Sequence, residues 1–290
     1  MDILIVGAHG FIGSALLADL RKRGHRVNVL SRHPRGGELL WDPSQGKIDP
    51  LDGFDCVINL AGEPIVGRWT QQKKERLRTS RIVASALLVA ALEKLKRPPA
   101  LYIAASAVGY YGDRGAEQLT ETSVPGEGFL AELVRQWEMV PQRLVVLGVR
   151  VVLLRLGIVL GREGGILAKL LPSFRWGLGA TLGSGKQYMS WIALQDLMMV
   201  ISFVLEREMA GPINCVAPGA VSQCTFAHAL GRLLHKGIHL TLPTFLLRLC
   251  LGEGATPLLA SARVLPVELR EAGFRFLYPD LESALQAQLR

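Results

Sequence analysis

The sequence predicts an α/β protein with a doubly wound parallel sheet and a smaller C-terminal lobe. Short apolar runs alternate with helical patterns through the first half of the 290 residues, which is the order of a parallel sheet with helices on both faces. The first run, residues 3–6, leads through Gly7, Gly10 and Gly13 into a helical pattern that ends at Gly24. A strand, a glycine turn and a helix in this order are typical of the opening unit of a Rossmann-type fold.

The spacing of these glycines predicts a dinucleotide site. Gly7 allows a sharp turn, Gly10 lets the backbone approach a diphosphate, and Gly13 lets the helix pack tightly on the strand. Phe11 and Ile12 begin the helix, whose free N–H groups lie at the positive end of its dipole. The alternative interpretation is a glycine turn without a ligand. Its place between a strand and a helix favours the nucleotide.

The second strand, residues 26–30, predicts which dinucleotide is bound. It ends in Ser31 and Arg32, with Arg35 shortly after. An NAD site usually places a carboxylate there to hold the ribose hydroxyls. A guanidinium suits a 2′-phosphate instead, so we predict NADP(H) as the cofactor. The alternative is that Arg32 is an ordinary solvated arginine of a loop.

The remaining elements follow in chain order. We expect a short strand at 38–41, a buried strand within 55–62, a long helix over about 70–95, and a strand at 101–105 that ends at Ser106. A helix over 129–147 should kink at Pro141, and a strand should follow at 149–154. Residues 161–185 read as a long glycine-rich loop, and its Phe174 and Trp176 favour a segment that faces a substrate.

The last third of the chain predicts a return to the sheet and then the lobe. We expect a short strand at 188–192, a helix capped by Asp196 and a core strand at 212–216. Ser222 should cap the next helix, and the tail should form a helix that stops at Gly273, a short strand and a final helix. Residues 1–160 and 187–218 would then form the dinucleotide-binding core. Residues 161–186 and 219–290 would form the substrate-binding lobe.

Composition argues against several classes of protein. Mean hydropathy is +0.27, but no apolar run reaches the roughly 18–20 residues that a membrane span needs, because Arg150 and Arg155 interrupt the best candidate at 144–160. The chain begins with a strand pattern and shows no signal peptide. The four cysteines are scattered and read as buried free thiols, which favours a cytoplasmic location. The six histidines show no ligand spacing, so no metal is expected.

The net charge of +8 raises the question of nucleic-acid binding. Basic residues cluster at 21–23, 73–81 and 94–97, near helix ends or on the polar side of the long helix. Aromatic residues do not alternate with them as a stacking platform would require. Solvated helix faces are therefore the preferred interpretation. A small-molecule substrate is the expected partner, and a homodimer is compatible with the sequence.

The motifs together resemble the extended short-chain dehydrogenase/reductase superfamily. More narrowly, the chain resembles an "epimerase family" subgroup that carries a C-terminal DUF1731 segment. The matching stretches are the glycine triplet, 59–62, 106–112, 126–131 with 137–138, 155–161, 183–192 and 265–285. The resemblance implies a cofactor loop formed by Asn59, Leu60, Ala61 and Gly62. It also implies a catalytic centre on and after the strand that ends at Ser106.

The superfamily's catalytic pair is missing from this chain. The resemblance implies a Tyr-x-x-x-Lys motif on the helix after Ser106, with tyrosine as the general acid or base and lysine beside it. No Tyr and no Lys occurs between Tyr111 and Lys169, and the equivalent positions carry Phe129 and Leu133. Neither side chain can transfer a proton. The usual proton relay is therefore absent.

Two functions remain open. In the first, the protein is an NADP(H)-dependent oxidoreductase or epimerase-like enzyme in which Ser106 orients a substrate carbonyl and Tyr110 or Tyr111 supplies a phenol. A carboxyl group at Glu127 or Glu132, or water, could donate the proton instead, and plain packing is the alternative role for both tyrosines.

In the second, the chain is a catalytically silent NADPH-binding sensor or scaffold. Residues 161–185 and 219–290 would then form a partner surface. The glycines and aromatic residues near the expected cleft favour the enzyme.

Overall fold

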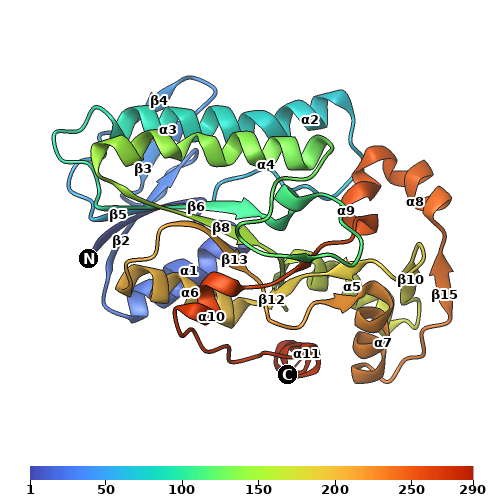
Figure 1. The fold of residues 1–290 in the computed structure, drawn as a ribbon. Coiled ribbons are helices and arrows are strands. Elements are labelled where there is room, and N and C mark those ends of the chain that lie inside the picture. The colour runs from blue at the N-terminus through green and yellow to red at the C-terminus, as the bar shows by residue number, and fades with distance from the viewer. Residues whose placement is uncertain (290) are drawn as a thin grey trace.

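The computed structural model describes residues 1–289 and contains the predicted parallel sheet (Figure 1). Its eight strands are, in spatial order, β13 (Gly211–Cys215), β8 (Arg150–Leu156), β6 (Leu101–Ala107), β5 (Cys56–Asn59), β1 (Asp2–Val6), β2 (Arg26–Ser31), β3 (Leu39–Asp42) and β4 (Lys47–Ile48). All neighbours are parallel except β3 and β4, which form an antiparallel edge. The chain reverses direction across the sheet between β1 and β5, which is the point where doubly wound folds bind ligands.

Helices cover both faces of this sheet, as Figure 1 shows. One face carries α1 (Phe11–Lys22) and α6 (Leu194–Glu206). The other carries α2 (Gln71–Arg78), a π-helical turn (Thr79–Val83), α3 (Ala84–Leu92) and α4 (Phe129–Met139). Successive side chains of β1 point to opposite faces of the sheet and so contribute to both cores. Ile3 and Ile5 belong to the core under α1 and α6, and Leu4 and Val6 belong to the core under α3.

The rest of the chain forms further helices and short strands, and a third hydrophobic core lies among some of them. These elements are β7 (Gln118–Leu119), β9 (Ile158–Gly161), α5 (Gly165–Arg175), β10 (Ala180–Leu182), β11 (Tyr188–Met189), β12 (Trp191–Ala193), β14 (Val221–Ser222), α7 (Gln223–Leu233), β15 (Leu240–Leu242), α8 (Thr244–Leu251), α9 (Thr256–Leu259), β16 (Arg263–Val264), α10 (Val267–Glu271) and α11 (Leu281–Leu289). This core joins Leu167 and Phe226 to Trp191, so both parts of the predicted division contribute to it. The division itself stays a prediction.

The prediction of a long loop over 161–185 is wrong. Residues 165–175 form α5, because Leu167, Leu171 and Phe174 recur on one helix face and are buried. Phe174 therefore belongs to the core of the lobe, whereas Trp176 just beyond the helix is exposed. Pro172 lies inside the helix. The glycines and this proline hid the helical period in the sequence.

Asp196 does not cap α6. Ala193 holds the N-cap position, and the buried Asp196 carboxylate accepts the backbone N–H groups of Leu277 (2.6 Å) and Tyr278 (3.0 Å). The strand expected after Gly273 is also wrong, since 274–279 is irregular. A buried acceptor satisfies two of its N–H groups, as a strand partner would have done.

Other expectations hold with shifted boundaries. Ser222 caps α7 as predicted, with its Oγ accepting from the Thr225 N–H at 3.0 Å. The helix over 70–95 forms as α2, the π turn and α3. Pro141 starts a 3₁₀ segment (Pro141–Leu147) directly after α4, and the strand at 188–192 divides into β11 and β12.

The structure also tests two expectations that rest on composition. Cys56 and Cys215 are buried free thiols, but Cys224 is half-buried and Cys250 is exposed, so the prediction of four buried thiols is wrong. Within residues 1–289, no helix combines the length and the apolar character needed to cross a membrane.

Replacing Gly13 by alanine should destabilise the fold itself. A Cβ on Gly13 would lie 2.2 Å from the Gly7 carbonyl oxygen and 2.8 Å from the Ala8 Cα, and both are backbone atoms that cannot move aside cheaply. We expect a loss of about 1–3 kcal/mol, the usual cost of overpacking, measured by urea unfolding. Ser14→Ala, at the next and exposed position, is the control. A Gly13→Ala protein as stable as the parent would contradict the close packing of α1 on β1.

Candidate functional site

The glycine turn after β1 leaves bare backbone at the start of α1. Gly7 adopts a φ of +86°, the Gly10 N–H donates to the Gly7 carbonyl at 3.1 Å, and Gly10 is the N-cap of the helix. A Cβ on the exposed Gly10 would meet only that carbonyl, at 3.3 Å, and otherwise open space. No acidic side chain lies in the first turn of α1. The turn therefore fits a diphosphate, which would occupy the space that a side chain at Gly10 would fill.

The side chain of Phe11, the first residue of α1, is packed against the lobe. Its ring packs into a corner made of Gly161, Gly164 and Gly165, where added Cβ atoms would lie between 2.3 and 3.2 Å from ring or side-chain carbons. Ile12 packs against the core under α1. These contacts explain why glycines gather at the start of the 161–185 segment. They tie the turn to the lobe.

The end of β2 presents the predicted phosphate ligand. Arg32 is exposed, and the Ser31 hydroxyl accepts the His33 N–H at 3.2 Å. The next acidic side chain in the sequence, Glu38, is engaged elsewhere: it contacts His9 at 3.1 Å and accepts the Arg35 N–H at 3.1 Å. The Arg32 guanidinium can therefore meet an anion.

The loop after β5 lies beside the glycine turn. A Cβ on Gly7 would lie 2.9 Å from the Ala61 nitrogen and from the Leu60 carbonyl carbon. The buried Asn59 fixes this loop, because its Oδ1 accepts the Ala61 N–H (3.2 Å) and its Nδ2 donates to Tyr102 Oη (3.1 Å). Gly62 at its end is exposed. Asn59 thus holds the loop from its buried side, while Leu60 and Ala61 are half-buried.

Ser106 and Tyr111 are engaged in a buried network. The Ser106 hydroxyl donates to Glu138 Oε1, and Glu138 forms a two-pronged ion pair with Arg155, with both N···O distances 2.8 Å. Arg155 also donates to the Tyr111 hydroxyl at 2.9 Å, which in turn donates to Asn214 Oδ1 at 2.7 Å. Both hydroxyl protons are therefore committed to partners inside the protein.

Ionisation in this network follows from burial and charge. Burial raises the pKa of Tyr111 to about 12, despite the nearby Arg155. Burial alone would lower the pKa of Arg155, but the hydrogen bonds and charge of Glu138 raise it. Arg155 therefore stays a cation and Tyr111 stays a neutral phenol. This geometry argues against Tyr111 and Ser106 as groups that exchange protons with a substrate.

Tyr110 is placed differently. It is half-buried, its ring packs edge-on against that of Tyr111, and the Arg155 guanidinium carbon lies 3.6 Å from its ring centroid. Its hydroxyl takes no part in the hydrogen bonds of the network just described. Of the three residues predicted for catalysis, Tyr110 alone combines partial exposure with a fixed ring.

The carboxylates considered as donors do not lie in apolar surroundings. Glu132 is exposed, and hydrogen bonds from Arg135 and Gln136 lower its pKa to about 2, so it lies on a solvated helix face. Glu127 is exposed as well. At the helix positions of the missing pair, Phe129 packs edge-on against Trp69 and Leu133 is buried.

Three charged residues of this region are not among the site residues that the sequence predicts. Glu121, Glu138 and Arg155 are all buried. Glu121 Oε1 accepts the N–H groups of Asn214 (3.1 Å) and Glu268 (3.4 Å), whereas its Oε2 has no hydrogen-bond partner among residues 1–289. The available signal was Arg155, a cation inside an otherwise apolar strand, which requires a buried partner.

The basic cluster at 73–81 is only partly a solvated face. Lys73 is buried and pairs with Glu63 at 2.6 Å, which corrects the expectation for this residue. Arg81, at the end of the same cluster, is half-buried beside Gly62. The cluster therefore reaches the loop after β5.

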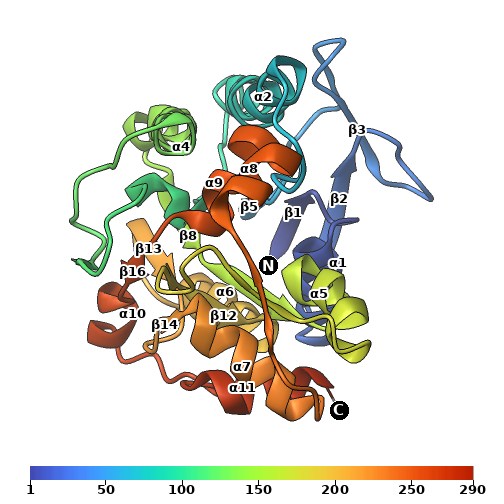
Figure 2. The ribbon, with the colours of Figure 1, turned by 90° about the vertical axis from the view of Figure 1, so that its right-hand side faces the viewer.

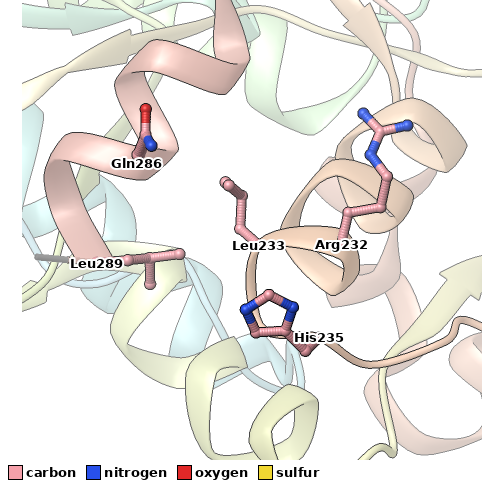
Figure 3. A pocket seen from close by; sticks show the side chains of 5 residues that line it. All are labelled: Arg232, Leu233, His235, Gln286 and Leu289. Atoms are coloured by element: carbon pink, nitrogen blue, oxygen red, sulfur yellow. The ribbon is translucent and has the colours of Figure 1, made fainter.

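Two hollows lie outside the glycine turn. One, of about 370 Å³, follows the Tyr110–Tyr111 turn and reaches the lobe; Asp113, Ser184, Lys186, Tyr188 and Ser261 are among the residues that line it. The other, of about 350 Å³, lies between the ends of α7 and α11 (Figure 3); it is lined by Arg232, Leu233, His235, Gln286 and Leu289. The first adjoins the predicted catalytic segment, and the second contains none of the predicted site residues.

Fold and site together define a class: a dinucleotide-binding α/β protein of the Rossmann type. Residues 3–216 match the model of the NAD dependent epimerase/dehydratase family, and residues 242–288 match a domain of unknown function, DUF1731. The chain therefore belongs to the NAD dependent epimerase/dehydratase family, with a C-terminal DUF1731 segment.

Relatives cover nearly the whole chain. Epimerase family protein Mb2239 of Mycobacterium bovis is 40% identical over 98% of this chain and 96% of its own length. Epimerase family protein YfhF of Bacillus subtilis is 36% identical over 98% and 97%. The crystal structure of human epimerase family protein SDR39U1 (isoform 2) with NADPH superposes with a TM-score of 0.93 at 33% identity, covering 99% of both chains. UDP-glucose 4-epimerase from Thermus thermophilus, at 19% identity and a TM-score of 0.79, shows the fold alone.

Glu121→Gln should stabilise the protein, and more so at higher pH. Burial raises the pKa of Glu121 above its ordinary value of 4.5, so the folded protein binds a proton more tightly than the unfolded chain. Stability is therefore lost as pH rises from that ordinary value through the folded one. Glutamine keeps the acceptor and removes the charge. We expect a rise in Tm of about 2–4 °C at pH 8, corresponding to about 1 kcal/mol, and a smaller rise at pH 5.

Glu127→Gln, an exposed change on the neighbouring loop, should show no such pH dependence. Calorimetry at pH 8 checks the prediction. A Glu121→Gln protein less stable than the parent would contradict it, because the ionised carboxylate would then stabilise the fold.

Proposed function

We propose that the protein is an NADP(H)-dependent oxidoreductase that acts on a small molecule. The observation that carries the proposal is the bare glycine turn at α1 with the Arg32 guanidinium at the end of the adjacent strand β2. The structure with NADPH of the 33% identical SDR39U1 supports the same cofactor here.

In this proposal, three segments of the chain bind different parts of the cofactor. The backbone of Gly7, Gly10, Phe11, Ile12 and Gly13 holds the diphosphate, and Ser31 with Arg32 holds the 2′-phosphate. The loop 59–62 lies along the dinucleotide beside the glycine turn. NADPH would supply a hydride, and the protein would supply orientation and exclusion of water.

The proton that accompanies the hydride is proposed to come from Tyr110. Its ring is held by Arg155 and Tyr111, and it is half-buried on the turn that follows β6. Ser106 and Tyr111 are then positioning residues, because they anchor this turn through Glu138 and Asn214. The hollow after the turn is the proposed substrate side.

A second function has its own support. The missing Tyr-x-x-x-Lys pair and the committed hydroxyls of Ser106 and Tyr111 favour a protein that binds NADPH without turnover. Such a sensor or scaffold would use the lobe as a partner surface. Turnover of any ligand with NADPH distinguishes the two.

Arg32→Asp should erase or reverse the preference for NADP(H). A charge-assisted hydrogen bond to phosphate contributes about 1.5–3 kcal/mol, so NADPH should bind at least about tenfold more weakly. An introduced carboxylate can instead accept hydrogen bonds from the ribose of NADH. Titration calorimetry with NADPH and NADH measures both effects. Lys47→Asp, on the exposed β3–β4 hairpin, is the charge-matched control, and equal affinities of the parent for the two cofactors would refute the assignment.

Tyr110→Phe and Tyr111→Phe should separate the two tyrosines. With a substrate found by screening in the presence of NADPH, Tyr110→Phe should lower the rate by about 10²–10⁴, the usual share of general acid catalysis. Tyr111→Phe should mainly lower stability, since it removes the hydrogen bond that Asn214 Oδ1 accepts and one of those that Arg155 Nη1 donates. Stopped-flow rates and thermal melts give the two readouts. A parental rate in Tyr110→Phe would exclude its phenol, and no turnover by the parent with any ligand would favour the sensor.

A further inference from the structure

We propose that the lobe binds the surface of an anionic lipid bilayer through one apolar and basic region, which we call the docking face. Its apolar part consists of six exposed side chains, Trp176, Leu178, Leu240, Leu242, Phe245 and Leu249. Trp176 is 83% exposed, Phe245 71% and Leu249 70%. Large apolar side chains gathered in one exposed region are typical of a binding surface.

The strands β10 and β15 supply the middle of the docking face. They pair in parallel, and Leu240 and Leu242 of β15 are two residues apart, so both point to the same side of this small sheet. The other side is turned toward α7, because a Cβ on Gly185 would lie within 3.0 Å of both the Thr181 methyl carbon and Cys224 of α7. The two leucines therefore point away from α7, and both are exposed.

The helix α8 continues the docking face directly after β15. Leu247 and Leu251 form its inner side, since Leu247 is buried and the Leu251 carbonyl accepts the Trp69 N–H at 3.3 Å. Phe245 and Leu249, four residues apart, lie together on the outer side. The strands β10 and β15 and the helix α8 lie along the right-hand margin of Figure 1, and Figure 2 views the molecule from that side.

The chain segments that build the docking face carry positive charge only. Residues 164–195 and 209–252 contain no Asp or Glu, but they contain six basic residues, all exposed: Lys169, Arg175, Lys186, Arg232, Lys236 and Arg248. Arg175 precedes Trp176, and Arg248 lies within α8. Within residues 1–289, neither of these two arginines forms an ion pair, so both are available to external anions.

This combination of side chains selects the partner. A bilayer with anionic headgroups offers negative charge to the basic residues and an apolar interior to tryptophan, phenylalanine and leucine. A second copy of the chain would bring two positive surfaces together, which costs free energy. Nucleic acid would match the charge but gives the leucines no apolar partner. Such an interfacial contact reaches about 5–10 Å into the bilayer and needs no spanning helix.

Flotation of the full chain with lipid vesicles tests the apolar part of the docking face. The protein should bind vesicles of phosphatidylglycerol and phosphatidylcholine at least about tenfold more tightly than vesicles of phosphatidylcholine alone. Phe245→Gln combined with Leu249→Gln should weaken binding to the mixed vesicles about tenfold or more, because the apolar contact is lost. Val145→Gln combined with Val146→Gln, at exposed apolar positions before β8, is the matched control and should leave binding unchanged.

A second pair of variants tests the basic part. Arg175→Gln combined with Arg248→Gln should weaken binding to the mixed vesicles about tenfold or more and should reduce its dependence on salt. Lys94→Gln combined with Lys96→Gln removes the same charge from exposed positions between α3 and β6. This control should bind like the parent.

The fluorescence of Trp176 tests insertion directly. Of the five tryptophans in the chain, Trp176 alone is exposed, and Trp41, Trp69, Trp137 and Trp191 are buried. Brominated acyl chains quench tryptophan fluorescence only at close range. Mixed vesicles that contain brominated phosphatidylcholine should therefore quench the parent, whereas Trp176→Phe should still bind and show no quenching.

Three outcomes would overturn the proposal: a parent that does not bind the mixed vesicles, parental binding in either docking-face pair, or no quenching of Trp176 in the bound parent. Self-association of the parent that Phe245→Gln with Leu249→Gln abolishes, measured by sedimentation without lipid, would instead assign the face to a second copy. Thermal melts check that each variant is folded. Phe245→Gln alone replaces its pair if that pair unfolds, with weaker binding again expected.

Discussion

The buried ion pair between Arg155 and Glu138 is the interaction on which the centre of this molecule depends. It joins β8 to α4, and through Ser106, Tyr111 and the Glu121 backbone carbonyl it reaches β6, the turn after it and the segment before α4. Two charges inside a protein are costly unless each is fully hydrogen-bonded. Here the guanidinium finds acceptors for Nε, Nη1 and Nη2, and both carboxylate oxygens accept. The pair therefore specifies one arrangement of these five segments.

This arrangement separates the proposed cofactor half of the site from the predicted catalytic half. The cofactor half is made of bare backbone and exposed or half-buried cations, which suit an anionic ligand without further change. The catalytic half carries hydroxyls that serve the interior of the protein. Family members with Tyr-x-x-x-Lys place a reactive phenol on the helix after β6; here that helix offers Phe129 and Leu133, and the nearest half-buried phenol, Tyr110, precedes it. Such a site can function in two ways. It can bind the cofactor without turnover, or it can catalyse a reaction with a different proton donor.

Local signals made most of the fold predictable, and non-local contacts limited the rest. Alternation of apolar runs with helical periods, the glycine triplet, and the cap at Ser222 depend on a few adjacent residues, so the sequence alone revealed them. The α5 helix is hidden in the sequence because the glycines before it form a tight turn that packs against the distant Phe11 ring. The position of Asp196 predicts a helix cap, but its partners Leu277 and Tyr278 are 81 and 82 residues away in the sequence. Likewise, Tyr110 and Tyr111 are neighbours in the sequence. They differ in their contacts with distant residues, because the Tyr111 hydroxyl is hydrogen-bonded to Arg155 and Asn214.

A crystal structure of the protein with NADPH bound tests the central claim most directly, because it shows where the hydroxyls of Ser106 and Tyr111 point when the site is occupied. We expect Ser106 Oγ to remain on Glu138 and the Tyr111 hydroxyl to remain between Arg155 and Asn214, with the diphosphate at the start of α1 and the Tyr110 hydroxyl facing the nicotinamide side. Release of either Ser106 or Tyr111 from the network, to hydrogen-bond the nicotinamide or a co-crystallised substrate, would contradict a cofactor site whose usual catalytic hydroxyls are committed to the fold.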